Sequence, residues 1–195
     1  MRARLSIVAI TFALAACATT APSPTATATP PDDGPTPSPP PTAPSGPVVI
    51  DPSLLDHLPT NVDGLEIMRR PESDLAAASD PVVTELGEGV VTGLAIDPAS
   101  ADFAYATLVR LRPGAFTAEL YRSWRDSFDQ GACSQAGGVV RTAITEISGR
   151  EVHIDSCEGG VRTYHAWLEK SRVLVSISSL GDRRLGELLV EGLRD

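Results

Sequence analysis

Residues 151–178 read EVHIDSCEGGVRTYHAWLEKSRVLVSIS, a stretch with three runs in which apolar and polar side chains alternate. Alternation of this kind is typical of β-strands that bury one face. The breaks between the runs, Glu158-Gly159-Gly160 and Glu169-Lys170-Ser171, are short enough for hairpin turns. The stretch therefore predicts three consecutive antiparallel strands at residues 151–156, 161–168 and 172–178, and residues 139–147 predict a strand before them.

The parity of the side chains assigns the residues of these strands to two faces of one sheet. Because side chains alternate along a strand, a single register decides which of them face the core. One face carries the apolar set Val152, Ile154, Tyr164, Ala166, Leu168, Val173, Val175 and Ile177. The other face carries His153, Asp155, His165 and Trp167. This second face is the more polar one, and it is where functional side chains are expected.

The relative position of the two histidines depends on the hairpin at residues 158–160. A three-residue loop places His153 directly opposite His165, flanked by Asp155 and Glu151, whereas a two-residue loop sends the histidines to opposite faces. Two imidazoles and a carboxylate can bind zinc or act in general acid–base catalysis. The alternative is a solvated face of ordinary polar side chains beside Trp167.

Recognised catalytic patterns are missing from the sequence. It has no zincin His-Glu-x-x-His, Walker loop, nucleophile elbow, Cys-x-x-Cys pair or EF-hand loop. Gly87-Glu88-Gly89 with Gly93 lacks the spacing of a dinucleotide-binding fingerprint. We therefore expect a non-enzymatic protein without a catalytic residue, a bound metal or a cofactor. The face with His153, Asp155 and His165 is the one candidate site.

A helix is predicted after a strand at residues 103–112. Thr117 is the expected N-cap, Phe116 and Tyr121 are spaced as a hydrophobic staple, and Gly131 marks the expected end. A last helix is expected near the C-terminus, with Asp182 as its cap. The inward stripe of the first of these helices is Leu120, Trp124, Ser127 and Phe128.

Prolines open two shorter predicted helices, at residues 71–78 and 81–86, after a helical turn at residues 52–58. Residues 90–96 fit either a helix or a strand. The order of elements predicts an α+β domain with an antiparallel sheet and helices packed on one face. Over residues 103–194 this order is similar to the Mog1/PsbP-like fold. The resemblance rests on topology without a diagnostic motif, and it implies an accessory protein outside the cytoplasm.

The start of the chain has the organisation of an export signal. Arg2 and Arg4 precede an apolar run at residues 5–14, which is too short for a membrane span because a span needs about 20 apolar residues. Leu14-Ala15-Ala16-Cys17 resembles the lipobox of bacterial lipoproteins. The resemblance implies a signal peptide at residues 1–16 and a diacylglyceryl anchor, with palmitate-type chains, on Cys17. It also implies a position on the outer face of the bacterial cytoplasmic membrane. The alternative is a secreted protein with a chance cysteine.

Residues 17–47 are almost entirely Ala, Thr, Ser, Gly and Pro, with Asp32 and Asp33 as the charged exceptions. Such a segment cannot bury a core, so we expect a disordered tether after the lipidated cysteine. At about 3.1 Å per residue in polyproline II conformation, a tether of roughly 30 residues reaches up to ~90 Å. Residues 48–195 are expected to fold as a single α+β domain.

The interpretation of Cys17 decides how the other two cysteines are read. With Cys17 lipidated, Cys133 and Cys157 remain as an even pair in an oxidising compartment, where disulfides persist. We therefore predict a disulfide between them. A catalytic or metal-binding cysteine is the alternative, although neither residue has a partner at two-residue spacing.

The chain is acidic, with a formal net charge of −9, which argues against nucleic-acid binding. Adjacent arginines are expected to be solvated or ion-paired, and Arg183-Arg184 predicts acidic neighbours. The leading functional expectation is a membrane-anchored module that binds or supports another envelope protein. The alternatives are a small-ligand binder or sensor with a sheet–helix cleft, and a metal-dependent hydrolase at His153 and His165.

Overall fold

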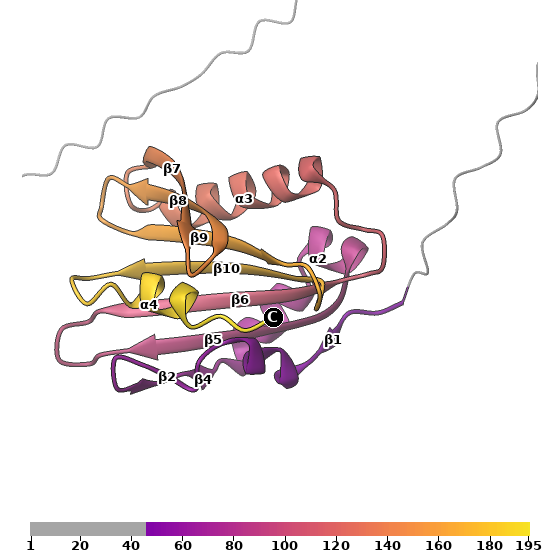
Figure 1. Ribbon diagram of the computed structural model, residues 1–195, viewed down its shortest axis with the longest axis horizontal. Helices are drawn as coiled ribbons and strands as arrows, with labels where there is room; N and C mark the ends of the chain where they lie inside the picture. The colour runs from indigo at the N-terminus through magenta and orange to yellow at the C-terminus, as the bar shows by residue number, and fades with distance from the viewer. Residues whose placement is uncertain (1–45) are drawn as a thin grey trace, which may run out of the picture. The chain divides into compact units, whose positions relative to one another are not determined.

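The structure, a computed structural model, describes residues 46–195. The predicted signal peptide, the lipobox with Cys17 and nearly all of the tether lie outside the described residues, so they remain predictions. The described part of the chain contains an eight-stranded sheet, a small two-stranded sheet and several helices. Figure 1 shows the long strands running side by side across the domain, with α3 along one edge of the view and α4 in front of them.

The main sheet has the order β1–β5–β6–β10–β9–β8–β7, and β4 also pairs with β5. Among the described pairs, that of β1 with β5 is parallel and the others are antiparallel. The strands of this sheet are β1 (Val49–Ile50), β4 (Met68–Arg69), β5 (Gly87–Ile96), β6 (Phe103–Leu111), β7 (Val139–Ile147), β8 (Arg150–Cys157), β9 (Arg162–Leu168) and β10 (Val173–Leu180). The small sheet pairs β2 (Asn61–Val62) with β3 (Leu65–Glu66).

The helical segments are η1 (Pro52–His57), α1 (Pro71–Ala78), α2 (Pro81–Leu86), α3 (Ala118–Cys133) and α4 (Leu185–Glu191). α1 and α2 begin at the predicted prolines, whose fixed φ suits the first turn of a helix. The N-cap of α3 is Thr117, as predicted, and its hydroxyl accepts a hydrogen bond from the Leu120 backbone N–H at 3.0 Å. The predicted starts of these helices are therefore correct where a proline or a capping hydroxyl marks them.

Two predicted helix ends are wrong. α3 continues through Gly131 to Cys133, and the positive φ angles that turn the chain occur later, at Gly137 and Gly138. α4 is not capped by Asp182, because it begins after Arg184, a residue in left-handed conformation without a capping side chain. In both places the chain turns at a residue that follows the expected one.

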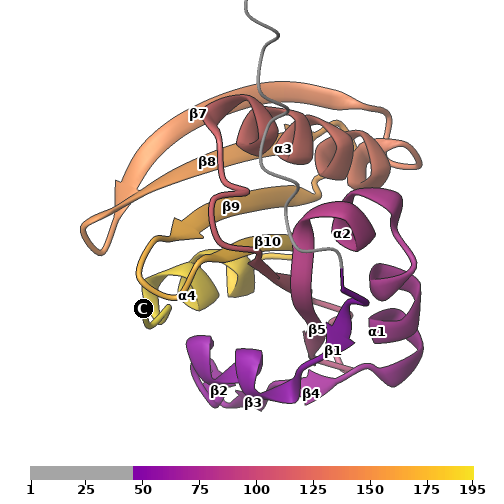
Figure 2. The ribbon, with the colours of Figure 1, turned by 90° about the vertical axis from the view of Figure 1, so that its right-hand side faces the viewer.

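The α+β class is confirmed, with one difference in how the helices are placed. α4 packs on the face of β6, β9 and β10 that carries Ala106, Tyr164 and Ile177. α3 packs on the opposite face of the same sheet, where Val109 and Leu174 are buried. Figure 2 shows the two helices on opposite sides of the curved sheet. Helices therefore cover both faces rather than one, because the central strands are apolar on both sides and each side needs a cover.

The hairpin between β8 and β9 has the three-residue loop. The Cys157 backbone N–H donates to the Val161 carbonyl at 2.8 Å, and the Gly160 N–H donates to the Cys157 carbonyl at 3.0 Å. His153 consequently pairs directly with His165. The predicted core face is confirmed as well, since one buried apolar cluster contains Val152, Tyr164, Ala166, Leu168, Val173, Val175 and Ile177, with Ile154 packed against it.

Cys133 and Cys157 form the predicted disulfide, which joins the end of α3 to the end of β8 across 24 positions of sequence. Their Cα atoms lie 5.2 Å apart, a separation that is ordinary for a disulfide. The bridge fixes the C-terminal end of α3 to the sheet, while the N-terminal end is held by contacts of Phe116 with Tyr121 and Trp167. The C-terminal end of α3 is therefore attached to β8, and its N-terminal end is attached to β9.

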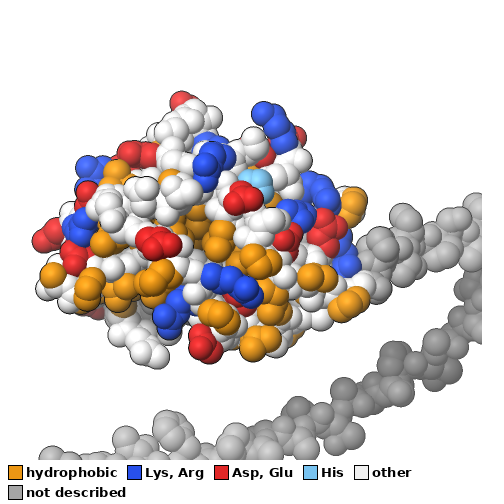
Figure 3. Space-filling view, turned by 90° about the horizontal axis from the view of Figure 1, so that it is seen from below, with side chains coloured by type: hydrophobic (Ala, Val, Ile, Leu, Met, Phe, Trp, Pro, Cys, Tyr) orange, Lys and Arg blue, Asp and Glu red, His pale blue; other side chains and the backbone are white. Residues whose placement is uncertain are grey.

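The surface carries mixed charge, and several arginines are paired with carboxylates. Arg183 lies 2.7 Å from Asp63 and 2.6 Å from Asp97, and Arg184 pairs with Glu187, which supplies the acidic neighbours that the sequence predicted. On the face seen in Figure 3, acidic, basic and apolar side chains are intermixed. None of the described helices is long and apolar enough to cross a membrane.

Candidate functional site

The residues of the predicted polar face lie beneath α3. His165 is 1% exposed and His153 is 9% exposed, so the alternative of a solvated face is wrong for the histidines. The reason is that α3 packs against β8, β9 and β10 on this side of the sheet. The third histidine, His57, lies in η1 and bonds to the Arg194 carbonyl at 2.8 Å, so it does not join the pair.

His165 is the centre of a buried hydrogen-bond network that connects α3 to the sheet. Its Nε2 lies 2.9 Å from Asp129 Oδ1, and its Nδ1 lies 2.9 Å from Ser176 Oγ. The Trp124 indole N–H donates to the same Ser176 oxygen at 2.8 Å, and the Thr163 hydroxyl donates to Asp129. Both ring nitrogens of His165 are therefore occupied, and two residues of α3 are bound to β9 and β10.

The network contains the serine, histidine and aspartate of a hydrolytic triad, but its serine is not accessible to a substrate. A catalytic serine must reach a substrate carbonyl, whereas Ser176 is fully buried (0% exposed). Its oxygen also accepts the indole N–H of Trp124. The network consequently has a structural role: it gives hydrogen-bond partners to buried polar groups that would otherwise destabilise the fold.

Asp129 and Asp155 form a pair of carboxyl groups at the edge of this network. Burial alone would raise the pKa of Asp129, but the hydrogen bond and charge of His165, together with the Thr163 hydroxyl, hold that pKa below its usual value. Burial and then the charge of Asp129 raise the pKa of Asp155. Of the two carboxyls, Asp155 is therefore the one that takes up a proton first as the pH falls.

His153 has a different environment from its cross-strand neighbour. Its Nε2 lies 3.2 Å from Glu151 Oε1, and its ring meets Tyr121 edge to face at 5.5 Å. Burial and the nearby charge of Arg125 lower the pKa of His153, and its buried Nδ1 has no hydrogen-bond partner among the described residues. The two histidines therefore face each other in the ladder but belong to separate surroundings.

A metal centre at the two histidines has no support in the geometry. The described residues contain no group of three or more His, Cys, Asp or Glu side chains arranged to hold a metal ion. Both nitrogens of His165 already have protein partners. The geometry therefore gives no basis for proposing a hydrolase at this face.

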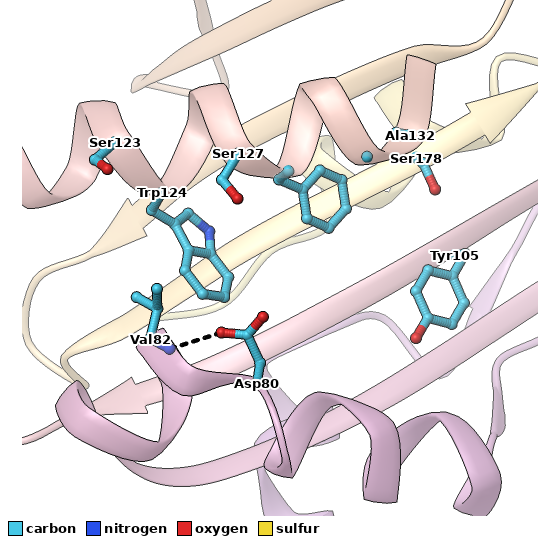
Figure 4. Close-up of a pocket in the computed structure, with 10 residues that line it drawn as sticks. Asp80, Val82, Tyr105, Ser123, Trp124, Ser127, Ala132 and Ser178 are labelled. Atoms are coloured by element: carbon cyan, nitrogen blue, oxygen red, sulfur yellow. Dashed lines mark hydrogen bonds between the residues drawn. The ribbon is translucent and has the colours of Figure 1, made fainter. Parts of the chain in front are cut away.

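A cleft of about 440 Å³ lies beside the network, between α3, the strands β6 and β10, and the start of α2. Trp124 and Phe128 contribute aromatic surface from α3, and Val82 adds apolar surface from α2. Figure 4 shows Trp124 projecting from α3 toward Asp80 and Val82, while Tyr105 lies toward the other end of the cleft. The cleft is thus a sheet–helix cleft of the kind that the sequence offered as an alternative.

Polar groups enter the cleft from the sheet and from α2. Tyr105 on β6 and Ser178 on β10 are directly opposite each other in the strand register, and both line the cleft. Asp80 Oδ1 accepts the backbone N–H groups of Val82 at 2.9 Å and Val83 at 3.2 Å. Its second carboxylate oxygen makes no hydrogen bond to a described residue. The cleft therefore combines aromatic walls with the hydroxyls of Tyr105 and Ser178, two serine hydroxyls of α3 and one carboxylate.

Sequence reasoning found some of these residues and missed others. Trp124, Ser127 and Phe128 were predicted as an inward stripe, and all of them line the cleft, although Ser127 stays exposed. Asp80 and Tyr105 were not recognised, because they come from different elements and form no local pattern. The one local signal was the Asp80-Pro81 dipeptide, which marks the start of a helix but says nothing of a ligand.

Compared with known proteins, the chain matches no family model, no curated protein and no solved structure. The resemblance of residues 103–194 to the Mog1/PsbP-like fold therefore stays a prediction. Any functional conclusion must come from the geometry of this chain alone.

Proposed function

We propose that this protein is a non-enzymatic binding module of the cell envelope, held at the membrane by a lipid on Cys17, and that it binds a small apolar molecule in the cleft beside α3. The observation that carries the proposal is the combination of Trp124 and Phe128 with the hydroxyls of Tyr105 and Ser178 in one cavity of about 440 Å³. Ligand sites are commonly concave, largely apolar and supplied with a few polar groups.

The chemistry of the cleft favours a ligand with a flat apolar body and a hydrogen-bond donor at one end. Aromatic rings bury large apolar areas and stack on planar molecules. The free oxygen of Asp80 is an acceptor at the α2 end, beside Trp124. A neutral aromatic amine meets both requirements, and it is the probe chemistry that we choose.

The test uses Trp124 as a reporter in a Trp167→Phe protein, which has no other tryptophan because the chain contains two. Titration with 1-aminoanthracene is expected to give a saturable change in Trp124 fluorescence. Ala132→Leu, which fills the cleft, is expected to weaken binding by about tenfold or more, whereas Gln130→Leu on the same helix outside the cleft is the matched control. Equal affinity in the two variants would contradict the proposal.

A second candidate function is the binding of an envelope protein at β7. This strand ends the sheet, and it exposes Val140 (62%) and Ile144 (61%). The outer edge of such a strand can pair with an extended segment of a partner. A photo-crosslinker at Val140 is expected to capture one defined protein in cells, while a crosslinker at Leu75, which is equally exposed at 62%, is expected to capture none.

The membrane anchor is tested separately. Mass spectrometry of the mature N-terminus is expected to find a lipid-modified Cys17, and a Cys17→Ser protein is expected to lose its stable attachment to membranes, because stable anchoring requires more than one acyl chain. An unmodified chain that starts at another residue would contradict this part of the proposal.

A further inference from the structure

A second depression, of about 430 Å³, lies at the N-terminal end of α3 and shares no lining residue with the cleft. Its cationic side chains are Arg122 and Arg125 from α3 and Arg150 from β8. We call it the arginine pocket. In a chain with a formal net charge of −9, three guanidinium groups around one cavity are an unusual local excess of positive charge.

The positive charge of the arginine pocket is poorly neutralised by the protein. Neither Arg122 nor Arg150 forms a hydrogen bond or an ion pair with a described residue, whereas Arg69, Arg110, Arg172, Arg183 and Arg184 each form a salt bridge elsewhere. Arg125 donates to the Tyr121 carbonyl at 3.4 Å and lies over the Tyr121 ring at 4.9 Å. Like charges held close together repel each other, and a bound anion would remove that repulsion.

The single carboxylate that lines the pocket is engaged with its histidine. Glu151 Oε1 lies 3.2 Å from His153 Nε2, so one acid faces three guanidinium groups. Counted with a neutral His153, the lining has a net positive charge. Guanidinium groups bind carboxylate and phosphate with two parallel hydrogen bonds, which gives both affinity and orientation.

The wall of the pocket is aromatic. Phe116 and Trp167 are stacked with their ring centroids 4.2 Å apart, and Tyr121 lies 5.8 Å from Phe116. These rings line the same depression as the arginines. Inorganic anions would use the charged side alone, whereas an anion with an apolar body would also cover the rings.

We propose that the arginine pocket binds a small organic anion, with a phosphate or carboxylate group on Arg122, Arg125 and Arg150 and a flat apolar body against the aromatic wall. The site shares no lining residue with the cleft, and it takes an anion where the cleft takes a neutral ligand. Its existence does not depend on the function proposed for the cleft, and each can be tested while the other is blocked.

His153 makes anion binding at this site dependent on pH. The charged and titratable groups around it are Arg125 from α3, Glu151 from β8 and His165 from β9, and Arg122 and Arg150 line the same pocket. In the free protein, burial and Arg125 lower the pKa of His153. A bound anion offsets the charge of Arg125 and raises that pKa, so binding is accompanied by proton uptake. The affinity for a carboxylate, which stays ionised near neutral pH, is therefore expected to increase as the pH falls through the anion-raised pKa of His153 and to level off below the lowered pKa of the free protein.

The experiment uses Trp167, which lies in the pocket wall, as the sole tryptophan of a Trp124→Phe protein. Phenyl phosphate is expected to change Trp167 fluorescence in a saturable way, with an affinity about tenfold higher than that of inorganic phosphate because of the aromatic contact. Benzoate tests the carboxylate arm, and neutral benzyl alcohol is expected not to bind. Calorimetry on the protein with both tryptophans provides a second measurement if Trp124→Phe perturbs the fold.

Arginine variants decide whether the pocket is the site. The Arg122→Ala/Arg150→Ala protein is expected to bind phenyl phosphate at least about tenfold more weakly, since each charge-assisted pair is strong. Arg141→Ala/Arg162→Ala removes two exposed arginines that lie outside the pocket and serves as the matched control, with a change below about twofold. His153→Gln is expected to remove most of the pH dependence of benzoate binding, because benzoate itself stays ionised near neutral pH.

Two results would overturn the proposal. One is the absence of saturable binding for both phenyl phosphate and benzoate, and the other is equal binding by the pocket double variant and its control. Ala132→Leu, which blocks the cleft, is expected to leave phenyl phosphate binding unchanged. If that variant abolished binding of the anion, the ligand would belong to the cleft and the arginine pocket would be excluded.

Discussion

The two sides of the sheet are closed in different ways. Beneath α4 the side chains of the sheet are almost all apolar, and they form one continuous buried cluster with Leu185 and Leu189 of the helix. Beneath α3 a smaller apolar cluster is joined by the buried polar residues Asp129, His165 and Ser176. Apolar packing fills space, whereas hydrogen-bonded groups are held at fixed directions. The cleft and the arginine pocket both lie on the α3 side.

The largest expected effect lies on the α4 side. Leu168→Ala removes a fully buried side chain from the main apolar cluster, and it is expected to reduce the free energy of unfolding by about 4 kcal/mol through lost transfer energy and a residual cavity. Urea denaturation measures the change. The exposed Val140→Ala is the control, with an expected change below about 0.5 kcal/mol, and equal losses in the two variants would contradict the assignment of this core.

The disulfide is expected to rank next. Replacing Cys133 and Cys157 with alanine releases a loop of about 25 residues, and the chain-entropy model assigns this loss about 3.5 kcal/mol. Denaturation of the oxidised protein, the reduced protein and the double variant measures it. If the reduced protein and the double variant were as stable as the oxidised one, α3 would be held to the sheet by its other contacts alone.

The buried network on the α3 side comes third. His165→Ala leaves the Asp129 carboxylate buried without its imidazole partner, which is expected to destabilise the fold by about 3 kcal/mol. Trp124→Phe keeps the apolar ring but removes the indole N–H from Ser176, and about 1 kcal/mol is expected. Urea denaturation measures both changes. If His165→Ala left the free energy of unfolding nearly unchanged, the network would contribute little to stability.

The smallest effect is a pH-dependent one at Asp155. Because the pKa of Asp155 is raised in the folded state, its contribution is favourable at low pH and is lost as the pH rises through that pKa. Asp155→Asn is therefore expected to stabilise the protein slightly at pH 7 and to leave it unchanged near about pH 4.

Asp129 has the opposite sign and provides the control. Its pKa is lowered in the folded state, so its contribution is present at neutral pH and is lost as the pH falls through that pKa. Asp129→Asn is expected to destabilise at pH 7, with a difference from the wild type that shrinks in acid. The free energy of unfolding is measured against pH for Asp155→Asn, Asp129→Asn and the wild type. If both variants changed stability in the same direction at pH 7, the opposite pKa shifts assigned to the two carboxyls would be contradicted.

The comparison of the two sides also explains what the sequence could predict. The hairpin between β8 and β9 was predicted from Glu158-Gly159-Gly160, because short glycine-containing loops join antiparallel strands. The structure selects the three-residue loop from the two lengths that the sequence left open. The apolar side followed from alternation in residues such as Tyr164, Ala166 and Leu168. Pro71 and Pro81 marked helix starts because their backbone is suited to a first turn. These features depend on neighbours in sequence, and they were predicted correctly.

The α3 side depends on contacts between distant parts of the chain, and there prediction was incomplete. Asp129 is 36 positions from His165 in the sequence, and no local pattern indicates that its helix would cover the polar face. The arginines of the arginine pocket are likewise divided between α3 and β8. The adjacent arginines Arg183 and Arg184 form a local sequence pattern, but the protein neutralises both with its own carboxylates.

α3 forms a wall of both the cleft and the arginine pocket, so one helix is shared between two independent cavities. A ligand in one cavity alters the affinity of the other only where it shifts this helix, and thermodynamic linkage then makes the effect reciprocal. The disulfide holds α3 at its C-terminal end and the contacts of Phe116 hold it at its N-terminal end, so a ligand in either cavity meets a wall that is fixed at both ends. The attachment of α3 thereby keeps the two cavities independent of each other, in addition to its contribution to stability.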